Sequence, residues 1–321
     1  MPTRCYNSIE EAAPELRSVP LHLAIGMFDG VHLGHHAVIE SAVHSARRCG
    51  GVAAVLTFWP HPSRLFRPDS PVQLIMSPAL KNRQLTRLGV NAVITQLFDR
   101  QFASIEAEEF LPRLKRLLPN LATIYVGENW RFGKGRLGDI HLLVNSARQL
   151  GINVVSAQRI KQNEEPISST RIRTYLAEGK MEEANALLGY SYFAEGVVAP
   201  GKQLGRKLGF PTLNVVWEPD QRPRFGVYTV RVSGPKTEAP LPAVANYGLR
   251  PTVENSIIPR LEIHLLAPCP FGVGDELLIE WLSFLRPEQR FDGVEALRIQ
   301  IAADRAAALD WFSHQPNQRS A

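Results

Sequence analysis

The residues best suited to chemistry are concentrated between Gly26 and His36, in the stretch G-M-F-D-G-V-H-L-G-H-H. An apolar run, residues 21–25, precedes it and an amphipathic run, residues 37–48, follows it, which predicts a strand, a glycine-rich turn and a helix. The first turn of a helix offers N–H groups without intrahelical partners and a positive partial charge, so anions bind there. His32 and His35 can both face that point and donate to phosphate oxygens. The stretch therefore predicts a cradle for a nucleoside triphosphate.

Other interpretations of this stretch have to be weighed. Gly26 and Gly30 are expected to allow positive φ and close approach of a ligand, and Gly34 leaves the helix start open. The two histidines could bind zinc, but the stretch has no Cys or Glu to complete the ligand set. A dinucleotide site would have G-x-G-x-x-G, which is absent. A purely structural turn would not call for this combination of Gly, Asp and His.

The composition indicates a globular protein of the reducing cytoplasm. The chain has 321 residues, enough for two domains, with 45% hydrophobic and 21% charged residues. Its three cysteines have no C-x-x-C spacing, which argues against a disulfide framework or a zinc ribbon. The first residues lack the apolar segment of a signal peptide, and no apolar run approaches the roughly 20 residues of a membrane helix. We therefore expect a cytoplasmic protein without a membrane partner.

The charge of the chain is mildly basic, with a formal net charge of +5 and a pI near 9.2. This balance suits anionic small molecules and could also suit nucleic acid. Lys and Arg are spread along the chain without a block of like charge, so we expect no nucleic-acid partner. The oligomeric state does not follow from the sequence.

The first half of the chain alternates strand and helix patterns. Beyond residues 21–25, strands are expected at residues 51–59, 90–97, 122–127 and 152–156. Helices are expected at residues 78–88, 106–118 and 137–150. This alternation predicts a doubly wound α/β domain with a parallel sheet, whose ligands bind outside the carboxyl ends of the strands.

Three further motifs occur near such positions: T-F-W-P-H-P (57–62), V-G-E-N-W-R-F-G (126–133) and I-S-S-T-R-I-R (167–173). The first could be a proline-flanked turn with an exposed His61, and Trp130 in the second could be a core aromatic residue. The run 127–135 fails as a Walker A loop because its spacing is too long and Gly135 replaces Ser/Thr.

The third motif opens a helix with Ser168, Ser169 and Thr170 as N-cap candidates. Capping does not call for arginine at a helix start, so Arg171 and Arg173 are expected to face phosphate. Residues 174–188 predict a helix broken around Gly179, and the α/β alternation stops there.

The second half predicts a small, mostly antiparallel β-barrel covered by a helix at residues 294–311. Its strands are expected at residues 193–199, 212–217, 226–232, 243–246, 260–266 and 276–282. The basic, glycine-rich segment Gly201 to Asn214 suits a loop over phosphates, although it could also be an exposed loop. By alternation, Glu262 lies on the solvent face of its strand.

These motifs resemble those of a known family. Gly26 to His35 resembles the H-x-G-H signature of nucleotidyltransferases and, as G-x-F-D-G-x-H-x-G-H, the FMN adenylyltransferase module of bifunctional riboflavin kinase/FAD synthetases. The segments 57–62, 126–133 and 167–173 resemble T-F-x-P-H-P, V-G-x-N-F-x-F-G and I-S-S-T-x-x-R of the same module. Gly201 to Asn214 resembles the riboflavin kinase signature G-x-x-x-G-R-x-L-G-x-P-T-A-N, with Leu213 in place of Ala.

The resemblance assigns the site residues of the first domain, residues 1–187. His32 and His35 are the catalytic pair, and His61 and Asn129 bind FMN or nucleotide. ATP is bound by Gly26, Phe28, Asp29, Gly30, His32, Gly34, His35, Ser168, Ser169, Thr170 and Arg171. The nucleophile of nucleotidyl transfer is already an anion, so catalysis would consist of positioning and charge neutralisation.

For the second domain, residues 188–321, the resemblance makes Glu262 the general base for the ribityl hydroxyl. ATP or flavin is bound by Gly201, Lys202, Gly205, Lys207, Gly209, Pro211, Thr212, Asn214 and Arg286. Thr212 and Asn214 point the same way from a strand and offer the hard oxygen ligands that suit Mg²⁺. One departure is the loop A-P-C-P-F-G (267–272), which is shorter than in the family and lacks an acidic residue.

The resemblance implies synthesis of FMN from riboflavin and of FAD from FMN, with ATP as co-substrate of both reactions and Mg²⁺ as cofactor. A nucleotidyltransferase for another phosphate-bearing substrate, or a nucleotide-binding regulator of RNA, are the alternatives. The second, kinase-like signature with Thr212, Asn214 and Glu262 argues against both.

Overall fold

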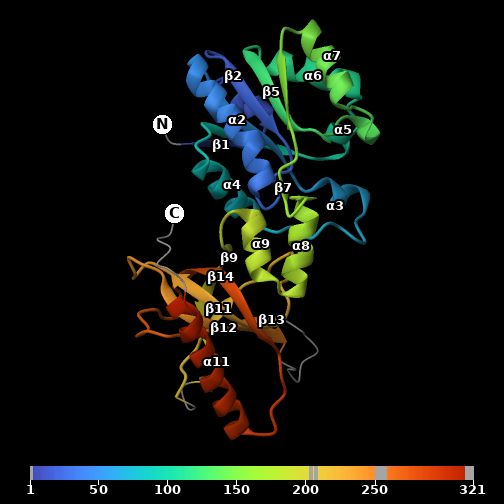
Figure 1. Cartoon of the computed structure of the whole chain (residues 1–321). Helices are drawn as coiled ribbons and strands as arrows, with labels where there is room; N and C mark the ends of the chain where they lie inside the picture. Colours follow the sequence, from blue (N-terminus) through green and yellow to red (C-terminus); the bar gives the residue numbers. More distant parts are fainter. Residues whose placement is uncertain (1–2, 202–204, 206–208, 250–258, 315–321) are drawn as a thin grey trace. The chain divides into compact units, whose positions relative to one another are not determined.

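The computed structural model describes residues 3–201, 205, 209–249 and 259–314 of the 321. The chain groups into two compact units, Met1–Ser169 and Thr170–Ala321 (Figure 1). Each unit has a sheet of its own, and each is described by itself. Among the described residues, no helix combines the length and the apolar character needed to cross a membrane.

The first unit is built on a six-stranded parallel sheet with the order β1-β4-β3-β2-β5-β6. Its strands are β1 (Arg4–Tyr6), β2 (Leu21–Ile25), β3 (Val52–Trp59), β4 (Ala92–Leu97), β5 (Leu121–Gly127) and β6 (Asn153–Ala157). Its helices are α1 (Ile9–Ala12), α2 (Leu33–Cys49), α3 (Pro62–Phe66), α4 (Pro78–Arg87), α5 (Arg100–Ala103), α6 (Ala107–Leu117) and α7 (Ile140–Gln149), with a 3₁₀ turn η1 (Lys134–Arg136). A hairpin of β7 (Lys161–Gln162) and β8 (Glu165–Pro166) follows. The predicted parallel α/β domain is confirmed.

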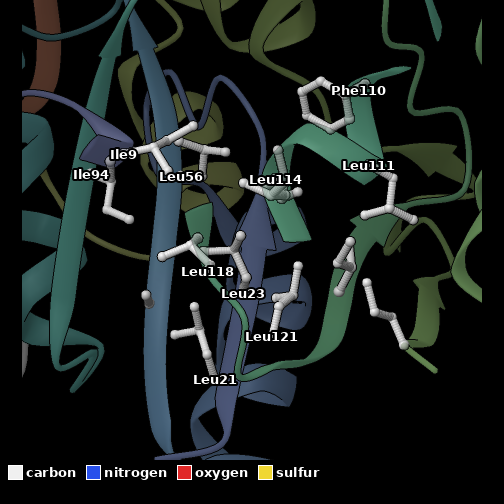
Figure 2. Close-up of a cluster of buried hydrophobic side chains, with 14 of the residues drawn as sticks. Ile9, Leu21, Leu23, Leu56, Ile94, Phe110, Leu111, Leu114, Leu118 and Leu121 are labelled. Carbon is white, nitrogen blue, oxygen red and sulfur yellow. The ribbon is translucent and has the colours of Figure 1, made fainter. Parts of the chain in front are cut away.

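Helices cover both faces of this sheet because both faces of its central strands are apolar. Side chains of α1, α6 and α7 pack on one face, where Leu21, Leu23 and Leu56 belong to the same buried cluster as Phe110 and Leu111 (Figure 2). Helix α2 packs against β2, β3 and β5 and contributes its own buried apolar stripe. The strand order reverses between β2 and β5, which is where doubly wound sheets bind ligands at the carboxyl edge.

The elements absent from the sequence prediction are short. β1 has three residues and joins the edge of the sheet beside β4. α1, α3 and α5 have four or five residues each, too few to show a helical period. Helix α2 begins at Leu33, so an additional turn containing Gly34 and His35 precedes the amphipathic run that predicted it.

The second unit is a closed six-stranded barrel with the order β10-β13-β12-β11-β14-β9, in which every pairing is antiparallel. Its strands are β9 (Tyr192–Ala199), β10 (Leu213–Val216), β11 (Gly226–Ser233), β12 (Leu241–Leu249), β13 (Pro259–Leu265) and β14 (Glu276–Pro287). Helices α8 (Ser169–Glu178), α9 (Met181–Leu188) and α11 (Val294–His314) complete it, and α11 lies against β11, β12 and β14 (Figure 1). The predicted barrel and its final helix are confirmed.

Large aromatic side chains fill the interior of the barrel. Tyr228, Tyr247 and Trp281 are fully buried. The ring centroid of Trp281 lies 4.6 Å from that of Tyr228 and 5.8 Å from that of Tyr247. The alternation of β13 places Leu261 and Ile263 in this interior. The same alternation leaves the residues between them on the outer face.

Helices α8 and α9 pack on the barrel, which explains the grouping of residues 170–188 with the second unit. Asn185 Nδ2 donates to the carbonyl of Trp281 at 2.8 Å, and the Asn185 side-chain oxygen accepts from Tyr192 N at 2.7 Å. Arg224 N donates to the carbonyl of Leu176 at 2.9 Å, and its guanidinium lies 5.1 Å from the ring of Phe284. The sequence places the domain boundary at residue 187, whereas this packing continues the second unit back to residue 170.

The two boundaries lead to a prediction about fragments. We expect residues 170–321 to be more stable than residues 188–321, because deleting α9 removes Met181 and Leu187, both fully buried. Each such buried side chain contributes about 1.5–3 kcal/mol. Thermal unfolding of the two purified fragments measures the difference. Equal melting temperatures would show that the two helices add nothing to the barrel.

Candidate active sites

The loop after β2 has an unusual backbone. Gly30 has φ of +82°, as predicted, while Phe28 and Val31 adopt φ of +50° and +33°. Such values in residues with side chains are strained by about 1–3 kcal/mol and cluster at functional sites. The prediction of positive φ was wrong for Gly26. Glycine is needed there because an added Cβ would come within 2.9 Å of the Phe28 ring.

His32 and His35 lie together at the start of α2. His32 is the N-cap residue, and the two imidazole rings stack with centroids 3.6 Å apart. The ring of Phe28 meets His35 edge-on at 5.3 Å. Gly34 makes room for this arrangement, since a Cβ there would lie 3.1 Å from the His32 ring. Burial, followed by the neighbouring His32, lowers the pKa of His35 well below its usual 6.5, so this imidazole is neutral at physiological pH.

The first residue of α8 and the segment just before it join this loop. Ser169 Oγ donates to the carbonyl oxygen of Asp29 at 2.8 Å, although the two residues are 140 positions apart in the sequence. An added Cβ at Gly34 would lie 3.6 Å from the carbonyl oxygen of Ile167. The stretch from Gly26 to His36 and the motif of residues 167–173 therefore meet, as expected at the rim of a doubly wound sheet.

The residues at the start of α8 differ in their surroundings. Ser168 is half-buried and Thr170 is exposed. Arg171 Nε donates to the Tyr175 hydroxyl at 3.0 Å, and its guanidinium lies 5.4 Å from the centre of that ring. This contact holds Arg171 along its own helix.

A lysine that was not among the predicted site residues links the carboxyl end of β3 to the same loop. Lys81, on α4, donates from Nζ to Thr57 Oγ1 at 3.0 Å and to the carbonyl oxygen of Met27 at 3.3 Å. Thr57 Oγ1 itself donates to the Met27 carbonyl at 3.1 Å. The available signal in the sequence is a lysine that follows Leu80 and precedes Leu85 by four residues, so that it lies on the apolar side of an amphipathic helix.

His61 and Asp29 line a small cavity together with Lys81. His61 is the N-cap residue of α3, and its Nδ1 accepts from Ser63 N at 3.1 Å. The Asp29 carboxylate is buried and accepts from the backbone N–H of Ile75 at 3.1 Å. The structure thus gathers His61 and residues of the Gly26 loop at one edge of the sheet.

The end of β5 places Asn129 beside an arginine. With its amide turned so that the oxygen faces Arg159, Asn129 accepts from Arg159 Nε at 2.7 Å. Arg159 also pairs with Glu128 at 3.4 Å. Arg159 was not among the predicted site residues, because it follows β6 without a recognisable motif. The side chains of Asn129 and Arg159 are exposed at the carboxyl edge of the neighbouring strands β5 and β6.

The aromatic residues of the same motif belong to the core. Trp130 and Phe132 stack with centroids 4.7 Å apart, and both contact Phe110 of α6. Phe132 is 6% exposed. Their packing therefore supports the interpretation as core aromatic residues.

In the second unit, Glu262 lies on the outer face of β13, as its alternation predicted, and is half-buried there. The strand registers place Asn214 of β10 and Asn246 of β12 directly opposite Glu262. Residues opposite each other in antiparallel strands have Cβ atoms about 4.5–5.5 Å apart on the same face. The carboxylate therefore lies in a polar row of three strands. Asn246 was missed because this register cannot be read from local sequence.

Two glycines allow the preceding loop to approach this row. An added Cβ at Gly201 would collide with the side-chain amide of Asn214. One at Gly205 would collide with the Phe210 carbonyl and lie 3.2 Å from Thr212 Oγ1. Gly209 has φ of +85°, which favours glycine. Lys202 and Lys207, predicted to bind ATP or flavin, lie outside the described residues.

A cavity of about 640 Å³ opens beside Thr212, lined by Gly209, Pro211, His264, Cys269 and Arg305 among others. That volume suits a ligand of nucleotide size. His264 Nδ1 hydrogen-bonds to the carbonyl of Pro211 at 2.9 Å. Part of the wall is formed by the loop of residues 267–272, whose sequence differs from the family pattern. The loop therefore contributes directly to the lining of the cavity, whereas Glu262 and Asn214 lie on the strands β13 and β10.

Arg286, predicted to bind ATP or flavin, lies in an ion pair between β14 and α11. Its Nε and Nη2 both donate to the carboxylate of Asp304 at 2.7 Å, and Asp304 is 7% exposed. Gln300 donates to the same carboxylate at 2.9 Å. The pair fixes the position of α11 against the barrel.

Comparison with known proteins gives consistent matches along the chain. Residues 17–171 match the family described as FAD synthetase, and residues 188–312 match riboflavin kinase. The bifunctional riboflavin kinase/FMN adenylyltransferase of Escherichia coli K12 is 37% identical over 290 residues, covering 90% of this chain and 92% of that protein. The Bacillus subtilis protein of the same name is 34% identical over 299 residues, 91% and 92% of the two chains. The crystal structure of a macrolide-efflux protein from Streptococcus pneumoniae matches with a TM-score of 0.85 and 28% identity, covering 97% of this chain and all of that chain.

Proposed function

The chain belongs to the family of bifunctional riboflavin kinase/FMN adenylyltransferases, and we propose how its own residues divide the two reactions. The carboxyl-terminal part phosphorylates riboflavin to FMN, and the amino-terminal part transfers an adenylyl group to FMN, giving FAD. Riboflavin, FMN and ATP are therefore its substrates. The observation that carries the residue assignments is the occurrence of two separate polar sites, one in each unit.

In the adenylyltransferase site, a phosphate oxygen of FMN attacks the α-phosphorus of ATP. A new P–O bond forms, the bond to the β-phosphate oxygen breaks, and pyrophosphate leaves. We propose that the start of α2, with His32 and His35, holds the triphosphate and the charge that develops on it. Ser169 fixes the Gly26 loop through Asp29, and His61 and Asn129 hold the flavin or nucleotide phosphate.

In the kinase site, the ribityl 5′-hydroxyl oxygen attacks the γ-phosphorus of ATP and ADP leaves. We propose that the Glu262 carboxylate accepts the proton of that hydroxyl, because an alcohol is a poor nucleophile until its proton is removed. Asn214 and Asn246, opposite Glu262, orient the groups that react. The cavity beside Thr212 receives the ATP.

The side-chain oxygens of Thr212 and Asn214 suit a magnesium ion. They offer a hydroxyl and an amide oxygen, and the two glycines 201 and 205 keep the space around them clear of side chains. Mg²⁺ held there would neutralise the phosphate charge of ATP. Among the described residues, no group of three or more His, Cys, Asp or Glu could hold a metal ion, so ATP phosphates would complete the ligand set.

Product analysis tests this function directly. Incubation of the purified chain with riboflavin, ATP and Mg²⁺ should give FMN first and FAD later, separated by chromatography. When FMN is supplied in place of riboflavin, the chain should still form FAD and pyrophosphate. Chelation of Mg²⁺ should stop formation of FMN. Formation of neither flavin nucleotide under these conditions would overturn the assignment.

A further inference from the structure

Lys81 is a buried lysine at the edge of the sheet where the adenylyltransferase residues gather. Lys81 is only 6% exposed, although its side chain carries an ammonium group. Two of its three N–H groups donate to Thr57 Oγ1 and to the Met27 carbonyl. The third has no hydrogen-bond acceptor among the described residues. A buried donor without an acceptor is costly, which points to a ligand that completes it.

The fold does not require an ammonium at this position. The Met27 carbonyl already accepts a hydrogen bond from Thr57 Oγ1, and the Asp29 carboxylate already accepts from Ile75 N. Moving a charge out of water costs several kcal/mol unless it is fully paired. An apolar side chain of similar length on α4 would avoid this cost. The presence of a buried lysine here is therefore explained by chemistry rather than by packing.

The surroundings of Lys81 are those of an anion site. It lines a small cavity with His61 and Asp29, and it interacts electrostatically with His35. The titratable groups that face it are therefore Asp29 from the loop after β2, His35 from α2 and His61 from the loop after β3. Asp29 carries the one negative charge among these groups. A phosphate oxygen at this cavity would meet the Lys81 ammonium and the His61 imidazole.

We propose that Lys81 is a further residue of the adenylyltransferase site, which ties the Gly26 loop to the end of β3 and donates its third N–H to a phosphate oxygen of the substrate. The inference rests on the proposed function of the first unit. Two phosphates could supply that oxygen, one from ATP and one from FMN. The chemistry of recognition is the same for both, and the kinetic experiment distinguishes them.

The proposal leads to a pH dependence. Burial lowers the pKa of Lys81 to about 8, against the opposing effect of Asp29. Above that pH the free protein loses the ammonium proton, and the site binds an anionic phosphate less well. The KM of the substrate that contacts Lys81 should therefore rise above about pH 8. Arginine stays charged throughout this range, so Lys81→Arg should lack the rise.

The experiment measures FAD formation from FMN and ATP with each substrate varied in turn. We expect Lys81→Met to lower kcat/KM by about 10²-fold or more, as loss of one charged donor does. Lys81→Arg should recover part of the activity. The matched control is Lys115→Met, because Lys115 Nζ also donates to a backbone carbonyl, that of Leu121, at the opposite end of the sheet. Riboflavin phosphorylation by the same chains should stay within about twofold of the parent, since the effect belongs to one site.

The outcomes separate the possible roles. A rise in the KM of ATP alone assigns the contact to ATP, and a rise in that of FMN alone assigns it to FMN. Lys81→Met should melt within a few degrees of the parent, because methionine removes a buried charge. Parental FAD formation by Lys81→Met would overturn the proposal, as would a loss that only follows a lowered melting temperature. Failure of the parent chain to make FAD would instead refute the function on which the proposal rests.

Discussion

Replacement of Glu262 by glutamine is expected to lower FMN formation by about 10²–10⁴-fold, the usual contribution of a general base. Glutamine keeps the size of the side chain but cannot accept the proton of the ribityl hydroxyl. Glu262 is half-buried on the outer face of β13, between Asn214 and Asn246. Substitution on that face leaves the buried Leu261 and Ile263 in place, so the barrel should fold normally.

The control for Glu262→Gln is Glu276→Gln, which alters an exposed carboxylate at the start of β14. It should phosphorylate riboflavin at the parental rate, because exposed substitutions of this kind have small effects. Both variants should convert supplied FMN to FAD unchanged. A Glu262→Gln chain that makes FMN as fast as the parent would show that another group accepts the proton.

Replacement of His35 by alanine is expected to stop the reaction at FMN. The His35 ring stacks on His32 at the start of α2, where its loss removes both a donor and the partner that holds His32 in place. Loss of one preorganised donor to developing charge typically costs about 10²–10³-fold. Riboflavin phosphorylation should be unaffected, so FMN should accumulate during incubation with riboflavin and ATP.

His44→Ala is the matched control for this variant, because His44 lies on the same helix and is exposed. It should give the parental yield of FAD. Chromatography of the flavins over time, with FMN and FAD quantified separately, measures both variants. Undiminished FAD formation by His35→Ala would remove the histidine pair from the proposed mechanism.

The parts of the fold that the sequence predicted are those with strong local patterns. The limits of β2 agree with the run 21–25, because a strand buried on both faces is mostly apolar, with His22 as the one polar residue of this strand. The barrel strands followed from alternation between short turns. The backbone of the Gly26 loop did not follow, because Phe28 takes a positive φ that its residue type disfavours.

The parts of the sites that the sequence missed depend on contacts between distant segments. Lys81 lies on a helix 54 positions from its Met27 partner, and Asn246 reaches Glu262 only through the register of β12 and β13. Lys81 belongs to no recognised local motif, and the position of Asn246 opposite Glu262 follows from strand pairing alone. The packing of α8 and α9 on the barrel likewise depends on contacts with Trp281 and Arg224, far along the chain. Local pattern therefore located the motifs, and tertiary structure supplied their neighbours.

The chain has two chemically independent sites that are linked by FMN, the product of the kinase site and the substrate of the adenylyltransferase site. The most direct test mixes the Glu262→Gln and His35→Ala chains and supplies riboflavin, ATP and Mg²⁺. Each variant alone should give almost no FAD, the first for lack of FMN and the second for lack of adenylyl transfer. The mixture should give FAD, because FMN released by one chain is a substrate of the other. A mixture of the two folded variants that makes FMN but no FAD would contradict the account.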